Sequence, residues 1–189
     1  MQDWKALQAW RKAERTRLIE RRMAAPLVER RAWSAVIERE LEQLIAKRAP
    51  RAIGFYWPFK AEFDPRPLVR RLLEAGVHAA LPVVLAPKTA MEFRLWTPET
   101  AMEIGVYDIP FPQLRNVVVP DFVLAPLVGF DAARYRLGYG GGYFDRTLAA
   151  LQPRPFAVGI GFELGRLATV YPQEHDLAMD ALITEAGVS

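Results

Sequence analysis

Cysteine is absent from the sequence, and histidine occurs only twice, as His78 and His175. Without cysteine the chain can form no disulfide bond, thiolate zinc site or cysteine nucleophile. Two imidazoles also argue against a histidine-rich metal site and against a mechanism that needs two histidines. Long apolar runs are missing as well, since the longest clear one, residues 79–87, is much shorter than the roughly 20 residues that span a membrane. The first residues carry charge and lack the apolar core of a signal peptide, so we expect a cytoplasmic protein with no membrane partner.

Lysine is scarce, because 20 of the 25 basic residues are arginine. The charge is also uneven: residues 1–51 contain 13 Lys and Arg against 7 Asp and Glu, whereas residues 52–189 contain 12 against 15. Arginine can hold a phosphate through two parallel hydrogen bonds, whereas lysine acts as a point charge. A basic N-terminal segment on an acidic body suits RNA binding, a small phosphorylated ligand, or a solvated helical face. Composition leaves these three alternatives open.

Helical and strand patterns alternate along the 189 residues. Apolar residues spaced by three and four predict helices over 65–75 and over 3–23 and 28–47, the last two forming an N-terminal helical pair. Short apolar or alternating runs predict strands over 52–57, 78–81, 91–96, 122–125, 156–160 and 181–184. A helix is expected over 140–151 after the glycines and a weak one over 163–170, while 97–120 has no clear period. This order predicts an α/β fold with a largely parallel sheet covered on both faces, in a single domain, 1–189.

Four glycines occur within five positions, at 138, 140, 141 and 142, directly before a predicted helix. Glycine allows positive φ and close approach of the backbone to a ligand, and a helix N-terminus offers free N–H donors with partial positive charge. With Arg136 and Arg146 beside it, the segment predicts an anion-binding loop; the alternative is a tight turn without a ligand. A Walker loop would need Gly-Lys-Ser/Thr, and a dinucleotide fingerprint would need glycine where Tyr143 stands, so neither pattern is met.

The segment Arg-Leu-Gly-Tyr-Gly-Gly-Gly-Tyr-Phe-Asp-Arg, residues 136–146, resembles the signature of the 5-formyltetrahydrofolate cyclo-ligase family. Further segments resemble the family in the same order, so that the likeness covers about residues 10–185; they are residues 80–84, 91–96, 120–131, 174–176 and 183–185. The resemblance implies a three-layer α/β/α sandwich. It also implies ATP- and Mg²⁺-dependent closure of 5-formyltetrahydrofolate to 5,10-methenyltetrahydrofolate, with release of ADP and phosphate.

The resemblance also implies which residues bind the nucleotide and the metal. The triphosphate is expected to contact the first helix and the glycine loop, through Arg11, Lys12, Arg15, Arg136, Leu137, Gly138, Tyr139, Gly140, Gly141, Gly142, Tyr143 and Phe144. Arg136 and Tyr143 are the implied catalytic residues, and Asp145 and Asp176 are the implied Mg²⁺ ligands. From the residues alone, Asp145 also suits the start of a helix and Asp176 a turn. Arg11, Arg15 and Arg22 share one helical stripe with Leu18, which also suits packing.

Glu62 is implied to contact the folate, because a carboxylate can accept paired hydrogen bonds from the amino edge of a pterin. Flat heterocycles bind apolar and aromatic surfaces, although most such side chains simply belong to a core. The residues expected to contact the folate in this way are Trp57, Met91, Phe93, Trp96 and, where the two substrates meet, Tyr143. Three positions depart from the family: Ala61 replaces a glycine, Arg11 a lysine, and Phe144 the commoner tyrosine.

These residues leave three functions open. The first is the ATP- and Mg²⁺-dependent folate ligase. The second is a folate-binding paralogue with weak or no turnover, motivated by Arg11 and Phe144. The third is an RNA-binding protein that uses the basic helices, against which the scarcity of lysine and the lack of an RNA-recognition signature argue. We expect small-molecule substrates, no nucleic-acid partner and a monomer.

Overall fold

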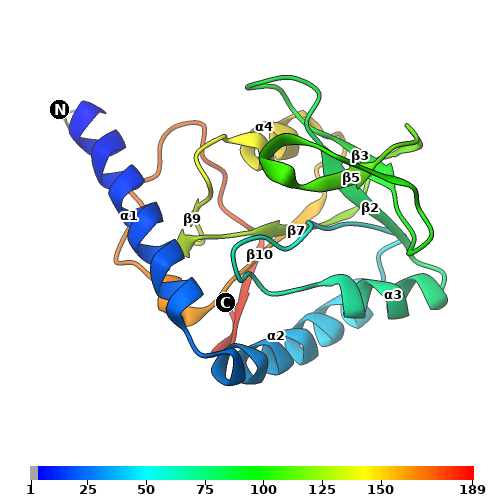
Figure 1. Ribbon diagram of the computed structural model, residues 1–189, viewed down its shortest axis with the longest axis horizontal. Helices are drawn as coiled ribbons and strands as arrows, with labels where there is room; N and C mark the ends of the chain where they lie inside the picture. The colour runs from blue at the N-terminus through cyan, green and yellow to red at the C-terminus, as the bar shows by residue number, and fades with distance from the viewer. Residues whose placement is uncertain (1–3) are drawn as a thin grey trace.

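The computed structural model describes residues 4–189 as one large sheet with helices on both faces (Figure 1). The helices are α1 (Trp4–Ala24), α2 (Leu27–Arg48), α3 (Arg66–Glu74), α4 (Tyr143–Ala150) and the short 3₁₀ turns η1 (Val106–Asp108) and η2 (Glu163–Gly165). The strands of the large sheet are β1 (Ala52–Gly54), β2 (His78–Val83), β3 (Glu92–Leu95), β6 (Val117–Val118), β7 (Phe122–Pro126), β10 (Phe156–Ile160), β11 (Ala181–Thr184) and β12 (Gly187–Val188). Two hairpins stand outside it, β4 (Met102–Ile104) with β5 (Pro110–Pro112) and β8 (Gly129–Phe130) with β9 (Arg136–Leu137).

The strands of the large sheet follow the order β12-β11-β10-β7-β1-β2-β3-β6. The central strands from β11 to β2 are all parallel to their neighbours. β12 at one edge, and β3 and β6 at the other, pair in the antiparallel sense. The predicted largely parallel sheet is thus confirmed, with the antiparallel strands confined to its edges.

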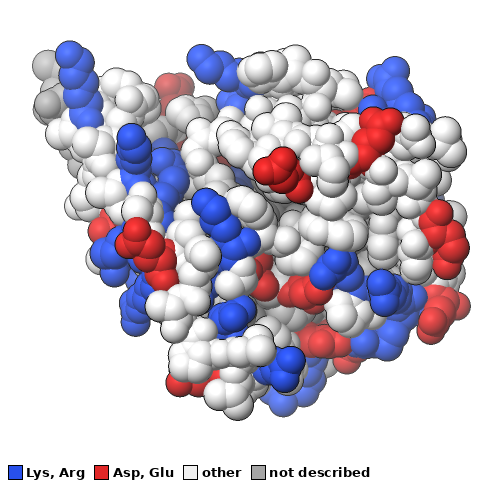
Figure 2. Space-filling model, in the orientation of Figure 1, with Lys and Arg blue, Asp and Glu red and all other residues white. Residues whose placement is uncertain are grey.

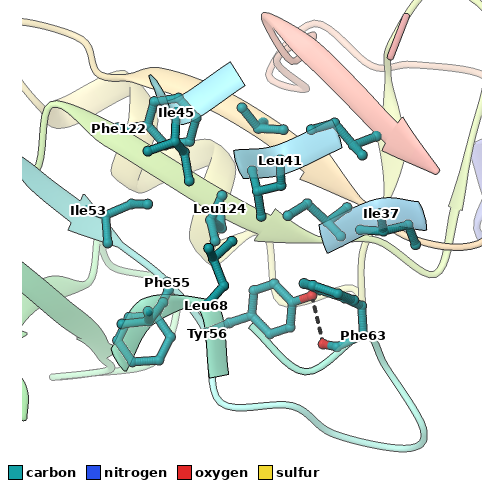
Figure 3. Packing of buried hydrophobic residues seen from close by; sticks show 14 of the residues in the cluster. Ile37, Leu41, Ile45, Ile53, Phe55, Tyr56, Phe63, Leu68, Phe122 and Leu124 are labelled. Atoms are coloured by element: carbon teal, nitrogen blue, oxygen red, sulfur yellow. Dashed lines mark hydrogen bonds between the residues drawn. The ribbon is translucent and has the colours of Figure 1, made fainter. Parts of the chain in front are cut away.

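α2 and α3 cover one face of the sheet (Figure 1). Ile37, Leu41 and Ile45 recur every four residues along α2, and all three side chains are buried. Figure 3 shows them on the side of the sheet that carries Phe122 and Leu124. Because a spacing of four keeps side chains on one helical face, this stripe docks α2 on the strands.

α4 covers the opposite face, where its Leu148 is buried against the sheet. Successive residues of β7 point to opposite faces, as in any strand. Phe122 and Leu124 belong to the core under α2, whereas Val123 and Ala125 belong to the core under α4. The three layers that the resemblance implied, α/β/α, are therefore confirmed.

α1 diverges from α2 at Pro26 and lies at one side of the sheet, next to β9 (Figure 1). The predicted N-terminal helices are both present, but they do not lie along each other; position 3 of the first prediction falls outside the described residues. Leu18 of α1 is buried against Gly129 of β8. α1 and α2 have 21 and 22 residues, yet no helix within residues 4–189 is apolar enough to cross a membrane.

Three segments fold differently from the prediction. Residues 97–120 were expected to be irregular but contain β4, η1, β5 and β6. Strands of two or three residues are too short to show an alternating pattern, which explains the error. The predicted helix over 163–170 is wrong, because only Glu163–Gly165 form a single 3₁₀ turn. The predicted strand over 52–57 ends at Gly54, and the residues after it leave the sheet for the cavity described below.

Candidate active site

A cavity of about 590 Å³ lies at the carboxyl ends of the central strands. Tyr56 and Trp57, which follow β1, line it together with Val83 at the end of β2 and Pro126 at the end of β7. The chain passes from β1 to β2 on one side of β1 and returns later on the other side with β7. Such a reversal of strand order leaves a crevice outside the strand ends, where open α/β sheets bind their ligands. The volume suits a small-molecule site.

The charged groups of the cavity come from distant parts of the chain. Five basic and three acidic side chains belong to its lining: Arg11, Lys12, Arg15, Lys60, Arg136, Glu62, Asp145 and Asp176. Basic side chains also follow α1 along the left edge of the molecule in Figure 2. All the charged residues that the resemblance implied therefore lie at one cavity, with an excess of positive charge that favours an anionic ligand.

The glycine loop, residues 138–142, connects β9 to α4 and lines the cavity along its whole length. Gly140 has φ +96°, a conformation that side chains with a Cβ rarely adopt. At Gly138 a Cβ would lie 2.6 Å from Nη1 of Arg136, so a side chain at this position would displace that guanidinium. Within residues 4–189, the backbone amides of 139–142 donate no hydrogen bond. Arg146 supports the loop from outside the cavity lining by donating to the Gly141 carbonyl.

Arg136 is buried beside the loop at the start of β9. Its Nη2 donates to Oδ2 of Asp145 over 2.8 Å, and its guanidinium carbon lies 5.2 Å from the centre of the Phe144 ring. Its Nε has no hydrogen-bond partner among the described residues. Burial lowers the pKa of Arg136, while the charges of Asp145 and Asp176 oppose that shift. A buried guanidinium with a donor to spare is suited to an incoming oxyanion.

The basic residues of α1 reach the cavity in different ways. Arg15 donates from Nε to the carbonyl of Gly138 over 2.7 Å, and burial and the charge of Arg11 lower its pKa. Arg11 donates to the Val170 carbonyl over 3.2 Å and forms an ion pair with Asp176. Lys12 is exposed and lines the cavity. Arg11 thus holds a carboxylate in place, and the neighbouring Lys12 carries a charge that is open to solvent.

Asp145 and Asp176 lie at the same end of the cavity. Oδ1 of Asp145 accepts the Leu177 amide over 3.3 Å, and Oδ2 of Asp176 accepts the Gln173 amide over 2.8 Å. Within residues 4–189 there is no group of three or more His, Asp or Glu arranged as metal ligands. Mg²⁺ does not require one, because it binds one or two carboxylates and completes its shell with phosphate and water oxygens. The donor set therefore fits Mg²⁺ at an anion site better than a metal bound by protein alone.

Glu62 lines the same cavity, and its side chain is only 4% exposed. Its Oε2 accepts the Phe59 amide over 2.8 Å, and its Oε1 accepts the Tyr139 hydroxyl over 2.6 Å. Burial raises the pKa of this carboxyl above its ordinary value of 4.5, although the charge of Arg22 and both hydrogen bonds favour the ionised form. A buried carboxylate at a cavity wall can recognise a ligand with paired N–H donors.

Trp57, Met91 and Tyr143 line the cavity, as expected for residues that contact a flat ligand. Trp96 does not, so its expected role as a substrate contact is not met: its ring packs edge-on against Phe55 in the core, with 5.2 Å between centroids. Phe93 is likewise part of the core, under α4. Alternation along a strand predicts which residues share a face but not which face meets a cavity.

The hairpin β4–β5 forms a cavity wall that the sequence did not reveal. The lining residues from 105 to 111 include Val106, Tyr107 and Phe111. The exposed fraction is 50% for Val106 and 65% for Tyr107. The segment has no regular period, so its role becomes visible only when it folds over the strand ends. Exposed apolar side chains of this kind beside a cavity are suited to contact an apolar part of a ligand.

The comparisons with known proteins all point to one family. Residues 7–185 match the model of the 5-formyltetrahydrofolate cyclo-ligase family. A 5-formyltetrahydrofolate cyclo-ligase of Haemophilus influenzae is 32% identical, covering 79% of this chain and 82% of that protein. The protein of the same name from Escherichia coli strain K12 is 30% identical, covering 84% of this chain and 96% of that protein.

Two solved structures with a similar fold are those of 5,10-methenyltetrahydrofolate synthetases. A 5,10-methenyltetrahydrofolate synthetase from Mycoplasma pneumoniae is 26% identical, with a TM-score of 0.76 and coverage of 93% of this chain and 98% of that one. The NMR structure of the Aquifex aeolicus 5,10-methenyltetrahydrofolate synthetase is 26% identical, with a TM-score of 0.81 and coverage of 94% and 91%. Because the family model matches residues 7–185 and relatives of that name are 30% and 32% identical, this chain belongs to the 5-formyltetrahydrofolate cyclo-ligase family.

Proposed function

We propose that this protein closes 5-formyltetrahydrofolate to 5,10-methenyltetrahydrofolate at the expense of ATP, with Mg²⁺, and releases ADP and phosphate. The observation that carries the proposal is that the glycine loop and Glu62 line the same cavity. An anion-binding loop and a carboxylate suited to a pterin are thereby available to two ligands at once. Family membership supports the reaction, and the geometry supports the residues.

The chemistry explains why the site needs a phosphate donor. A formamide carbonyl is a poor electrophile, and its oxygen is a poor leaving group. Transfer of the γ-phosphoryl group to the formyl oxygen breaks the bond to ADP and leaves an iminium-like carbon. N10 of the same folate then attacks that carbon and loses its proton to solvent, the C–O bond breaks, and phosphate leaves with the oxygen. Such a reaction depends mainly on alignment and on neutralising charge, rather than on acid–base groups.

The residues of the loop are assigned to the triphosphate. The amides of residues 139–142 are available as donors, and Arg136 adds a buried positive charge with an unpaired Nε. Arg15 and Lys12 extend the positive surface along α1. Tyr143, at the first position of α4, lies where the loop meets the rest of the cavity and is assigned to the contact between the two substrates.

Asp145 and Asp176 are assigned to Mg²⁺, with Arg11 and Arg136 holding them in place. The metal would neutralise phosphate oxygens during transfer. Glu62 is assigned to the pterin, with Trp57 and Met91 as apolar walls. The protein is further proposed to act in the cytoplasm. It is also proposed to be a monomer, and its mass in gel filtration tests that oligomeric state.

The RNA-binding alternative is disfavoured by the direction of the arginines on α1. Arg11, Arg15 and Arg22 all donate to carbonyls or carboxylates of other segments of the chain. Cations that are committed to internal partners are poorly placed to release counterions from a nucleic acid.

The experiment is direct. Purified protein is mixed with 5-formyltetrahydrofolate, ATP and Mg²⁺, and the near-ultraviolet absorbance of the methenyl product is followed. We expect an absorbance rise that requires both ATP and Mg²⁺ and is accompanied by one phosphate per product. Tight folate binding without any ATP-dependent rise would reject the ligase and select the folate-binding paralogue.

A further inference from the structure

Tyr139 links the glycine loop to the folate wall of the cavity. Its hydroxyl donates to Oε1 of Glu62 over 2.6 Å, and Nη2 of Arg22 donates to the same hydroxyl over 2.7 Å. The guanidinium of Arg22 also lies 3.7 Å from Oε1 of Glu62. The three side chains therefore form one closed group that joins α1, the segment after β1, and the loop.

Arg22 is the fixed point of this group. It is 4% exposed, and it donates from Nε to the Lys60 carbonyl over 2.9 Å and from Nη1 to the Leu127 carbonyl over 3.2 Å. These bonds tie it to the segments that follow β1 and β7. Since its Nε and Nη1 both donate to backbone carbonyls, Arg22 can hold the Tyr139 hydroxyl in one orientation through Nη2.

Tyr139 lies within the glycine loop, so it belongs to the wall that is assigned to the nucleotide. It is 39% exposed and lines the cavity, and its ring contacts that of Phe59 at 5.8 Å between centroids. Phe59 donates its amide to the other oxygen of Glu62. Any rearrangement of the loop therefore moves a hydrogen-bond donor of the carboxylate that is assigned to the pterin.

We propose that Tyr139, held by Arg22, is a positioning residue that couples the two substrate sites, so that nucleotide and folate each strengthen the binding of the other. A ligand that orders the loop also orders Tyr139 and Glu62, and the second ligand then binds a site that is already arranged. By linkage the effect is the same in both directions. The inference rests on the proposed function, since it takes the loop as the nucleotide site and Glu62 as the folate site.

The test measures the coupling without turnover. The dissociation constant of 5-formyltetrahydrofolate is determined by calorimetry with and without Mg²⁺ and an ATP analogue that has an imido bridge between its β- and γ-phosphates. We expect the analogue to tighten folate binding by about tenfold in the wild type, within the usual range of coupling between sites. In Tyr139→Phe the ratio should fall to near one.

Tyr171→Phe is the matched control, because Tyr171 is 38% exposed, packs against Trp10 of α1 and lies outside the cavity lining. It should keep the wild-type ratio. Arg22→Lys retains the charge but loses the fork of donors, so it should reduce the ratio in the same way as Tyr139→Phe. In a Glu62→Gln background, Tyr139→Phe should cause little further change, because the partner through which it acts is already altered.

Equal folate affinity with and without the analogue in the wild type would overturn the inference, as would a wild-type ratio in Tyr139→Phe. A Tyr139→Phe variant that loses only nucleotide affinity would also overturn it. Failure of the ligase itself is seen separately, as a wild type that binds both ligands but forms no methenyl product.

Discussion

Arg136 and Asp145 form an ion pair across the glycine loop, with 2.8 Å between Nη2 and Oδ2. The pair joins the residue that enters the loop from β9 to the first turn of α4. It fixes the ends of the loop relative to each other and keeps a buried cation beside a carboxylate. The second oxygen of Asp145 accepts only a long bond from the Leu177 amide, at 3.3 Å, so this carboxylate retains lone pairs for a cation.

Asp145→Asn should therefore reduce turnover by about 100-fold and raise the Mg²⁺ concentration needed for half-maximal rate, because the ligand charge is lost. Initial rates over a Mg²⁺ series measure both effects. The control is Asp180→Asn, which also breaks a pair with arginine, at 2.9 Å to Arg154, but outside the cavity lining. It should lower the melting temperature without changing the Mg²⁺ dependence. A wild-type Mg²⁺ profile in Asp145→Asn would contradict the metal role.

Gly140→Ala should weaken ATP binding, because φ is +96° at this position and a Cβ would approach Arg15 to 3.3 Å. Left-handed backbone costs a residue with a Cβ about 1–2 kcal/mol, so stability should fall as well. Gly76→Ala separates the two effects: its φ is +86°, and its Cβ would meet nothing within 4 Å. Both variants should melt at lower temperature, but only Gly140→Ala should raise the KM for ATP. Similar KM values in the two variants would argue against nucleotide binding by the loop.

Arg15→Ala should raise the KM for ATP by about tenfold, because a charge-assisted hydrogen bond of about 1.5 kcal/mol corresponds to that factor. The KM for folate should change much less. Arg17→Ala is the control on the same helix, since Arg17 is 52% exposed in its side chain and pairs with Glu14. Steady-state kinetics with either substrate varied distinguish the two. An equal rise in both KM values for Arg15→Ala would count against its assignment to the triphosphate.

Glu62→Gln should raise the KM for folate by about tenfold at neutral pH, because the carboxylate loses its charge. The KM for ATP should rise less. In the wild type, folate affinity should weaken as the pH is lowered toward 4.5, since burial raises the pKa of Glu62 above that value and the protonated form loses an acceptor. Calorimetric titration at several pH values should show this trend in the wild type and a flatter one in Glu62→Gln. Parallel pH profiles would contradict a pterin contact by the ionised group.

The same raised pKa affects stability with the opposite trend. Between the ordinary pKa and the raised one, the folded chain holds a proton that the unfolded chain has lost, so the contribution of Glu62 to stability falls as the pH rises. The melting temperature of the wild type relative to Glu62→Gln should therefore decrease across that interval. Binding favours ionised Glu62 and folding favours the protonated form, which is typical of a residue retained for function.

The helices and strands that were predicted correctly are those whose buried residues repeat with a regular period. The stripe of Ile37, Leu41 and Ile45 indicated α2, and the apolar runs indicated the central strands, because burial on one face imposes a period on the sequence. The glycines before Tyr143 indicated the loop for a different reason, because glycine allows positive φ and close approach of the backbone to a ligand. The hairpin around Tyr107 was missed, since its conformation depends on packing over the strand ends rather than on its own periodicity.

The candidate site was predicted in its charges but not in its contacts. The stripe of Arg11, Arg15 and Arg22 showed that these cations share a face, yet their partners lie more than 30 positions away. Trp96 was assigned to the ligand although it packs in the core, because aromatic residues serve both purposes. Contacts between the side chains of distant segments depend on how the helices and strands are arranged in space, and the local patterns of one sequence do not predict that arrangement.

The ion pair between Arg11 and Asp176 spans 165 positions of the chain. During synthesis the helix that carries Arg11 leaves the ribosome early, and Asp176 emerges only near completion, so the end of the cavity proposed for the metal is assembled last. A chain that ends before Asp176 contains the residues of β1 to β10 but lacks this ion pair. Detachment of α1 alone would remove Arg11, Lys12 and Arg15 from the cavity without breaking any pairing between strands of the large sheet.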